Sequence, residues 1–369
     1  MRKMKKWIAG ILVCSLLFFG CAAADEGSSK DADKTAETVS EKQEDVAQIP
    51  YLIVDKDYNV VGTNHFENVQ VINLSIDDIF HLGANYSEPG WGDSDQKRSY
   101  KIVSDAFKNC PKLKQIIFSA QSNVSEVAED AFKGCAEDLT VYCEKESELW
   151  KRLQQMGISV SDVSLLEDAK EETIYLMDRE NTLLGFFTNE FNDGNSDKSD
   201  VTMHLPDETK KTADSCFAHT YAMGAEIVIP EGVEEVGENA FSTSEFGKIT
   251  FLGNKIKTIR KGTFIVNNSC IKKLEIPEGV ENIEEKVFEA THMEELVIPE
   301  TVKTVKDENI ALFADKLIVR GKDTKFREDT LSDQKEWTDD VEKAEVHCYK
   351  GSEAEKYFKE LGCKIVYLN

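Results

Sequence analysis

Cysteine and histidine are the residues in this chain best suited to nucleophilic or metal chemistry, but their spacing supports neither. Cys14 and Cys21 fall in an apolar N-terminal segment, and no two of the other seven cysteines form a C-x-x-C pair. The six histidines are scattered, and H-E-x-x-H, G-x-S-x-G and a glycine-rich phosphate loop do not occur. We therefore expect no catalytic residue, no metal site and no cofactor.

Most of the seven later cysteines are expected to be buried free thiols. Cys110 and Cys135 each follow a phenylalanine by three residues, a repeated position that favours a small buried side chain. Cys143 and Cys348 occupy equivalent places in two similar segments. The spacing is compatible with a Cys348–Cys363 disulfide, but the sequence does not decide the pairing.

Asp55, Asp57 and Asn59 have the spacing of the first ligands of a calcium loop. Such a loop needs glycine at its sixth position and glutamate at its twelfth, where this chain has Val60 and Phe66. A hairpin turn is therefore the favoured interpretation.

The N-terminus has the organisation of an export signal, which we assign to residues 1–21. Basic residues are followed by an apolar run of about fourteen residues, too short for a typical transmembrane span. Phe18 to Cys21 resembles a bacterial lipobox, in which the cysteine is lipidated and becomes the first residue. Ala22 to Ala24 offers the alternative of ordinary secretion. We favour a lipid anchor at Cys21 because a small residue, Gly20, precedes it.

Residues 22–48 contain eight acidic residues, three lysines and little apolar surface. Such a segment cannot bury enough area to offset the entropy of ordering, so we expect a disordered tether. Signal and tether together predict a protein outside the cytoplasm, attached to the bacterial cell envelope by lipid or otherwise secreted.

A repeat of about 23 residues organises the remaining chain. Its large apolar anchor recurs at Phe217, Phe241, Phe264, Phe288 and Ile310, at intervals of 24, 23, 24 and 22 residues. A fixed period of this size is typical of a solenoid, in which neighbouring repeats bury one another's apolar faces.

The pattern of each repeat predicts one short strand, then a turn, and then an irregular or helical segment that leads back to the next strand. In the phrase around Ile276, apolar and polar residues alternate, Pro277 cannot donate to a strand ladder, and Gly279 allows a turn. Stacked copies should form a parallel ladder. The predicted fold class is therefore an α/β solenoid with short parallel strands.

The chain also contains a duplication, which predicts two tandem modules at residues 49–165 and 172–369. Residues 51–62 and 174–185 share a hairpin pattern that would cap each module at its start. Residues 143–157 and 348–362 share a helix-like stretch at a constant offset of 205 residues, with Ser147 and Ser352 at the N-cap position.

The phrases at residues 229–241 and 276–288 resemble BspA-type leucine-rich repeats, as do those around Phe107 and Phe132. The resemblance covers about residues 100–160 and 210–369. Two departures are Ile310, which replaces the aromatic anchor, and Ile256, which lacks the Ile-Pro lead-in. The resemblance implies an extracellular, surface-attached bacterial protein of a kind often proposed as an adhesin, and no catalytic residues.

Two stretches break the repeat pattern and hold candidate contacts with a partner, because Tyr and Trp are favoured interface residues. The candidates are Tyr86, Trp91, Tyr100, Phe326 and Trp337. The alternative is that these aromatic side chains cover the ends of the core.

The formal net charge of −25 would become −29 after loss of the signal and disfavours nucleic acid as a partner. The favoured function is a non-catalytic binding or adhesion scaffold for a protein or glycan. The main alternative is a structural protein that packs against other envelope proteins, and an envelope enzyme ranks last.

Overall fold

The computed structural model describes residues 48–74, 100–118, 124–166, 173–188, 197–220, 222–265, 271–307, 310–327 and 344–369. All of them belong to one compact unit that spans Ala47 to Asn369. The predicted signal and nearly all of the predicted tether lie outside the described residues. Within the described ranges, no helix has the length and apolar character that a membrane crossing requires.

Parallel ladders of short strands build the part of the chain before residue 167. One sheet has the order β3-β5-β7-β8, and β4 and β6 continue a second sheet. The strands are β3 (Val71–Asn73), β4 (Tyr100–Ile102), β5 (Gln115–Ile117), β6 (Val124–Val127), β7 (Thr140–Cys143) and β8 (Ser159–Asp162).

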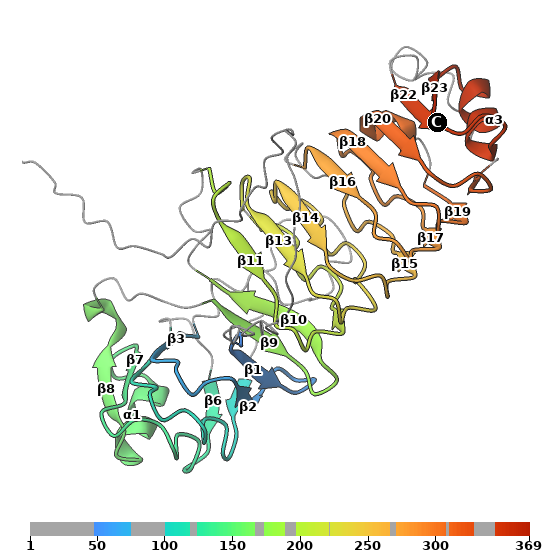
Figure 1. Cartoon of the computed structure of the whole chain (residues 1–369). Helices are drawn as coiled ribbons and strands as arrows, with labels where there is room; N and C mark the ends of the chain where they lie inside the picture. The colour runs from blue at the N-terminus through green and yellow to red at the C-terminus, as the bar shows by residue number, and fades with distance from the viewer. Residues whose placement is uncertain are drawn as a thin grey trace, which may run out of the picture. The chain divides into compact units, whose positions relative to one another are not determined.

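The later part of the chain contains a longer array of rungs, which follow one another in sequence order (Figure 1). One face of the array carries sheets β11-β13-β14 and β16-β18-β20-β22-β23. Their strands are β11 (Thr202–His204), β13 (Glu226–Ile229), β14 (Lys248–Phe251), β16 (Lys273–Glu275), β18 (Met293–Ile298), β20 (Ala314–Val319), β22 (Glu345–Cys348) and β23 (Lys364–Tyr367).

A second ladder runs beside the first and is made of two-residue strands. Its members are β15 (Thr258–Ile259), β17 (Asn282–Ile283), β19 (Thr304–Val305) and β21 (Lys325–Phe326). Strand β12 (Lys211–Thr212) precedes them and pairs with β10 in another sheet. In register, Glu226 pairs with Lys248 and Thr258 pairs with Asn282, offsets of 22 and 24 residues. The fold is thus a parallel β-solenoid, as the alternation of apolar residues predicted.

The recurring phenylalanines form the centre of this array. Phe217, Phe241, Phe264 and Phe288 have no exposed surface, and consecutive rings stack with centroids 4.9, 5.7 and 5.7 Å apart. Their even spacing in sequence becomes a continuous aromatic stack because each rung presents the same position to its neighbour. Ile310 closes the row and is 2% exposed.

Two antiparallel hairpins form the central sheet. They consist of β1 (Tyr51–Val54) with β2 (Val60–Asn64), and β9 (Ile174–Met177) with β10 (Thr182–Phe187). Strand β1 also pairs in parallel with β9, so one sheet runs β12-β10-β9-β1-β2-β4-β6. The hairpins were predicted as separate caps, whereas here they lie side by side. The division into two modules stays a prediction.

Two α-helices occur among the described residues, α1 (Glu148–Gln155) and α3 (Glu353–Glu360). The hydroxyl of Ser147 accepts the N–H of Trp150, and that of Ser352 accepts the N–H of Glu355, both at 3.1 Å. Gly157 and Gly362 follow the helices with φ of 75° and 85°, the left-handed region that glycine tolerates best. Short 3₁₀ turns cover Val163–Leu165 and Ile310–Phe313.

Candidate binding surface

The residues predicted to meet a partner do not come together in a surface. Tyr86, Trp91 and Trp337 lie outside the described residues, as does Cys21. Tyr100 is 7% exposed at the start of β4. Phe326 is 9% exposed in β21, where its ring packs on Tyr357 and Phe358. This burial agrees with the interpretation that such aromatics cover the core, and the partner-binding role stays a prediction.

The described cysteines are free thiols in unreactive surroundings. Cys348 and Cys363 are both buried and unpaired, and Cys270 lies outside the described residues. Burial raises the pKa of Cys363 and of Cys110 to about 11, and that of Cys135 to about 12. A thiol with so high a pKa is a poor nucleophile and metal ligand at neutral pH. Across the described ranges, no three His, Cys, Asp or Glu side chains could hold a metal ion.

The outer face of the β16–β23 sheet carries a row of alternating charge. Register places Lys273, Glu295, Lys316, Glu345 and Lys364 on consecutive strands. Glu295 pairs with Lys273 at 2.8 Å and with Lys316 at 2.7 Å, and Glu345 pairs with Lys364. Hydrogen bonds from these lysines lower the pKa of Glu295 and of Glu345.

A second row of alternating charge follows the two-residue strands. Lys210, Glu234, Lys257, Glu281 and Lys303 stand at the same position of successive rungs. Lys303 pairs with Glu281 and lowers its pKa. Positive and negative residues alternate in both rows, so neither row forms a single-sign groove of the kind that attracts a polyion.

The regular surface is interrupted at the turn after β14. After β13, β16 and β18 the strand leads through Pro230, Pro277 or Pro299 to a buried valine four residues beyond the preceding isoleucine. Here Phe251 is followed by Ile256, which makes the turn one residue longer and leaves it without proline. Leu252 in this turn is 62% exposed.

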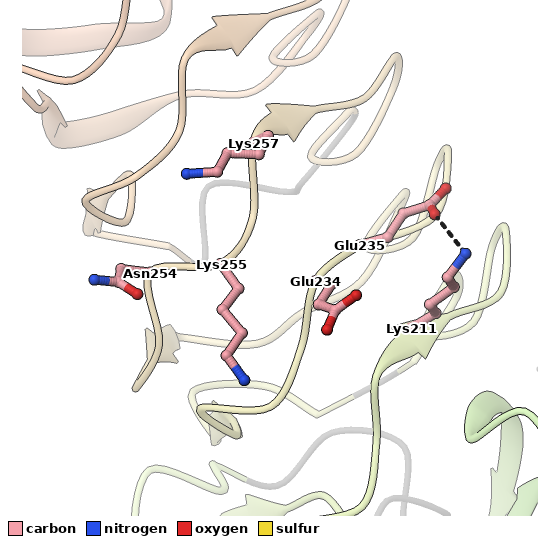
Figure 2. Close-up of a pocket in the computed structure, with 6 residues that line it drawn as sticks. All are labelled: Lys211, Glu234, Glu235, Asn254, Lys255 and Lys257. Atoms are coloured by element: carbon pink, nitrogen blue, oxygen red, sulfur yellow. Dashed lines mark ion pairs between the residues drawn. The ribbon is translucent and has the colours of Figure 1, made fainter.

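A shallow depression of about 560 Å³ lies beside this long turn and is lined by Lys211, Glu234, Glu235, Asn254, Lys255 and Lys257. Figure 2 shows the side chains of Glu234 and Lys255 extending into the space between their rungs. Lys211 and Glu235 form an ion pair of 3.3 Å.

Three of the lining side chains are free to meet a ligand. Glu234, Asn254 and Lys255 are exposed, and within the described structure their side chains have no hydrogen-bond or ion-pair partner. Glu235, in contrast, forms ion pairs with both Lys211 and Arg260, the latter at 2.9 Å. We call Leu252, Glu234, Asn254 and Lys255 the long-turn surface.

The long-turn surface combines two hydrogen-bond donors, two acceptors and one apolar side chain. This chemistry suits recognition of a polar macromolecule, because an exposed apolar side chain adds area while amide and charged groups give direction. It holds no serine, cysteine or histidine that could act as a nucleophile or as an imidazole base. The sequence marked this place only as a repeat without Ile-Pro, and the extra residue in the turn was the missed signal.

Residues 96–147 and 195–314 match the BspA type leucine rich repeat region, in six copies. No curated protein sequence matches the chain.

Three solved structures are similar over part of the chain. A leucine rich cell surface protein from Faecalibacterium prausnitzii is 18% identical over 56% of this chain, with a TM-score of 0.31, and this chain spans 59% of that protein. The pneumococcal vaccine antigen PcpA is 14% identical, with 73% and 68% of the two chains covered and a TM-score of 0.41. A leucine-rich repeat protein from Bacteroides ovatus is 14% identical over 88% and 99%, with a TM-score of 0.17. The six repeats and the parallel β-solenoid identify this chain as a protein with BspA-type leucine-rich repeats.

Proposed function

We propose that the chain is a non-catalytic extracellular scaffold that binds a protein or glycan through the outer surface of its repeats. The long-turn surface carries this proposal. In the first row of charge, Glu295 already pairs with Lys273 and Lys316, whereas Glu234, Asn254 and Lys255 are exposed and have no side-chain partner among the described residues. Leu252, in the same turn as Asn254 and Lys255, is also exposed. A binding site needs such unsatisfied groups, because groups already paired gain little from a ligand.

The N-terminal sequence supports a place on the bacterial cell envelope. The export signal and the cysteine after Gly20 favour lipidation at Cys21, and the acidic segment that follows would set the repeats away from the membrane. An adhesin needs this arrangement, since its binding surface must reach macromolecules beyond its own membrane.

The test uses the chain from residue 22, presented to matrix glycoproteins, mucins and cell-wall polysaccharides at low and high salt. We expect saturable binding to one of these classes, and at least tenfold weaker binding by the double variant Asn254→Ala with Lys255→Ala. The matched control is Glu300→Ala, which changes an exposed residue of a regular proline-containing turn. Equal binding by the double variant and the unchanged chain would exclude the long-turn surface.

The alternative function, assembly with other envelope proteins, is favoured by the two sheets that end in β8 and β23. Each is the last strand of its sheet among the described residues, and Tyr367 in β23 is 45% exposed. An unpaired strand edge is a template for another chain. Concentration-dependent association in sedimentation experiments, together with no binding in the ligand array, would favour assembly over adhesion.

A further inference from the structure

Strands β1 and β9 are buried on both faces. All four residues of β9 are buried, as are three of the four residues of β1. Because successive side chains of a strand point to opposite faces, the two strands supply apolar groups in two directions. Each direction leads into a different hydrophobic cluster.

Each hydrophobic cluster also contains side chains from the hairpin of the other half of the chain. We call the pairing of β1 with β9, across which they reach, the seam. The cluster of the earlier rungs, which contains Phe107 and Val141, also contains Ile174 and Leu176 from β9. The cluster of the later rungs, which contains the phenylalanine stack, also contains Tyr51 from β1. Each hairpin therefore closes the core of the other half of the chain as well as its own.

A chain of polar contacts crosses the same seam. The Tyr51 hydroxyl accepts a hydrogen bond from Asn64 Nδ2 at 2.6 Å, and Asn64 Nδ2 lies 3.1 Å from His65 Nε2. His65 Nε2 lies 2.7 Å from Oε1 of Glu208, 143 residues further along. A carboxylate can only accept, so a hydrogen on Nε2 is donated to Glu208. Asn64 Nδ2 is also a donor, so it is a close neighbour of this Nε2 and not its hydrogen-bond partner.

The seam holds the two halves of the chain together through contacts between β1 and β9, which do not include the segment that connects the halves in sequence. Tyr51, Leu52 and Ile53 stand in register with Tyr175, Leu176 and Met177. Tyr51, Leu52, Ile174 and Leu176 are no more than 5% exposed. Separation would expose one face of β1 and one face of β9, and exposure of buried apolar side chains to water is unfavourable.

We infer that the two repeat arrays complete each other's cores through β1 and β9 and unfold as one cooperative unit. The contact between His65 and Glu208 stabilises the pairing of β1 with β9. The arrays are therefore not independent domains joined by a linker, and a partner would contact both of them in one fixed arrangement. This inference is independent of the long-turn surface and of the ligand.

The first test cuts the connection between the halves in the folded protein. A protease site placed within residues 167–172 is cleaved in the otherwise unchanged chain, and the product is passed over a sizing column. We expect the two fragments to elute together in buffer and to separate only in denaturant. Elution as two separate fragments in buffer would overturn the inference.

The second test asks whether damage on one side of the seam reaches the other. Phe241→Ala lies in the later array, and hydrogen exchange is followed at residues 139–153 in the earlier one. We expect protection to fall by a similar factor in both places. A fall confined to the later array, with residues 139–153 unchanged, would show that the halves unfold independently.

The contact between His65 and Glu208 is tested in the cleaved protein with Glu208→Ala. We expect its fragments to separate at lower denaturant concentration than those of the unchanged sequence. Asp207→Ala, which alters the exposed neighbouring residue, should have no effect. Equal behaviour of Glu208→Ala and Asp207→Ala would remove the polar contact from the inference.

Discussion

The two helical ends of the chain, residues 139–166 and 344–369, share a backbone plan but are stabilised by different chemistry. Each has a strand ending in cysteine, a serine cap, an eight-residue helix, a left-handed glycine and a parallel strand. Position 150 in the first corresponds to position 355 in the second, where tryptophan is replaced by glutamate.

Glu355 is the centre of a polar network in the second end. It is 8% exposed and accepts from the Gly351 N–H, from Lys359 and from the Tyr367 hydroxyl, the last at 2.6 Å. The corresponding residues of the first end, Trp150, Gln154 and Asp162, form no such network.

The first end is instead tied to its array by Arg152, whose guanidinium donates to the Val127 carbonyl at 2.9 and 2.7 Å. The corresponding residue of the second end, Tyr357, stacks on Phe326. Comparison of the two ends shows that a repeat array can be closed by a network within the last segment or by a bond back to an earlier rung.

The largest expected effect comes from the apolar position that both helices bury completely. Phe358→Ala should lower the free energy of unfolding by about 3–5 kcal/mol, because the ring contacts both Phe326 and Tyr357. Leu153→Ala, at the matching place, should lower it by about 2–5 kcal/mol. Urea unfolding of both variants measures the difference, and a larger loss for Leu153→Ala would contradict the greater role of aromatic packing at the second end.

The next largest effect on the free energy of unfolding is expected from Asp307, which lies in a rung near the second end. The N–H of Phe107 donates to the Ala131 carbonyl and that of Phe264 to the Val287 carbonyl, but Phe288 donates to the carboxylate of Asp307 at 2.8 Å. Burial raises the pKa of Asp307 to about 7, against the hydrogen bonds from the backbone N–H groups of Phe288, Val287 and Lys286. The folded chain therefore holds this proton more tightly than the unfolded chain does.

As pH rises from about 4 to about 7, the Asp307 contribution should lower the free energy of unfolding by roughly 2–4 kcal/mol in total. Above the folded pKa this contribution should become constant. Unfolding measured from pH 4 to pH 8 in the unchanged chain and in Asp307→Asn isolates the effect. Identical pH profiles for the two proteins would show that Asp307 does not titrate in this range.

The sequence predicted what periodicity controls and missed what tertiary contact controls. Phe217 to Phe288 and the caps Ser147 and Ser352 were recognised, because local spacing decides which face a side chain occupies. Pairing of β1 with β9 joins segments more than a hundred residues apart and leaves no local pattern. The same holds for the candidate surface, because the residues that line its depression come from different rungs.

Arg152 tests the bond that only the first end possesses. Arg152→Ala should lower the free energy of unfolding by about 1–2 kcal/mol, since the Val127 carbonyl loses a charged donor on a partly exposed surface. Lys151→Ala is the control, because its ion pair with Glu148 is exposed and should contribute little to stability. Hydrogen exchange at β6 should report the loss directly. Unchanged protection there would assign the closure of the first end to apolar packing alone.

Substitution of Glu355 should change stability least at neutral pH, but it should change how stability depends on pH in acid. Hydrogen bonds from Lys359, Tyr367 and the Gly351 N–H lower its pKa to about 2, so the folded chain keeps this carboxylate charged where the unfolded chain would protonate it. The resulting stabilisation is fully present above about pH 4.5 and is lost as pH falls toward 2. Its sign is therefore opposite to that of Asp307.

Glu355→Gln should flatten the acid limb of the stability profile, whereas Glu353→Gln, at an exposed residue of the same helix, should leave it unchanged. Exchange protection of β23 between pH 5 and pH 2 measures both variants, because Tyr367 links this strand to the network. If β23 in Glu355→Gln loses protection over the same pH range as in the unchanged chain, the carboxylate does not hold this strand. The two ends would then be closed by packing alike, despite the exchange of tryptophan for glutamate.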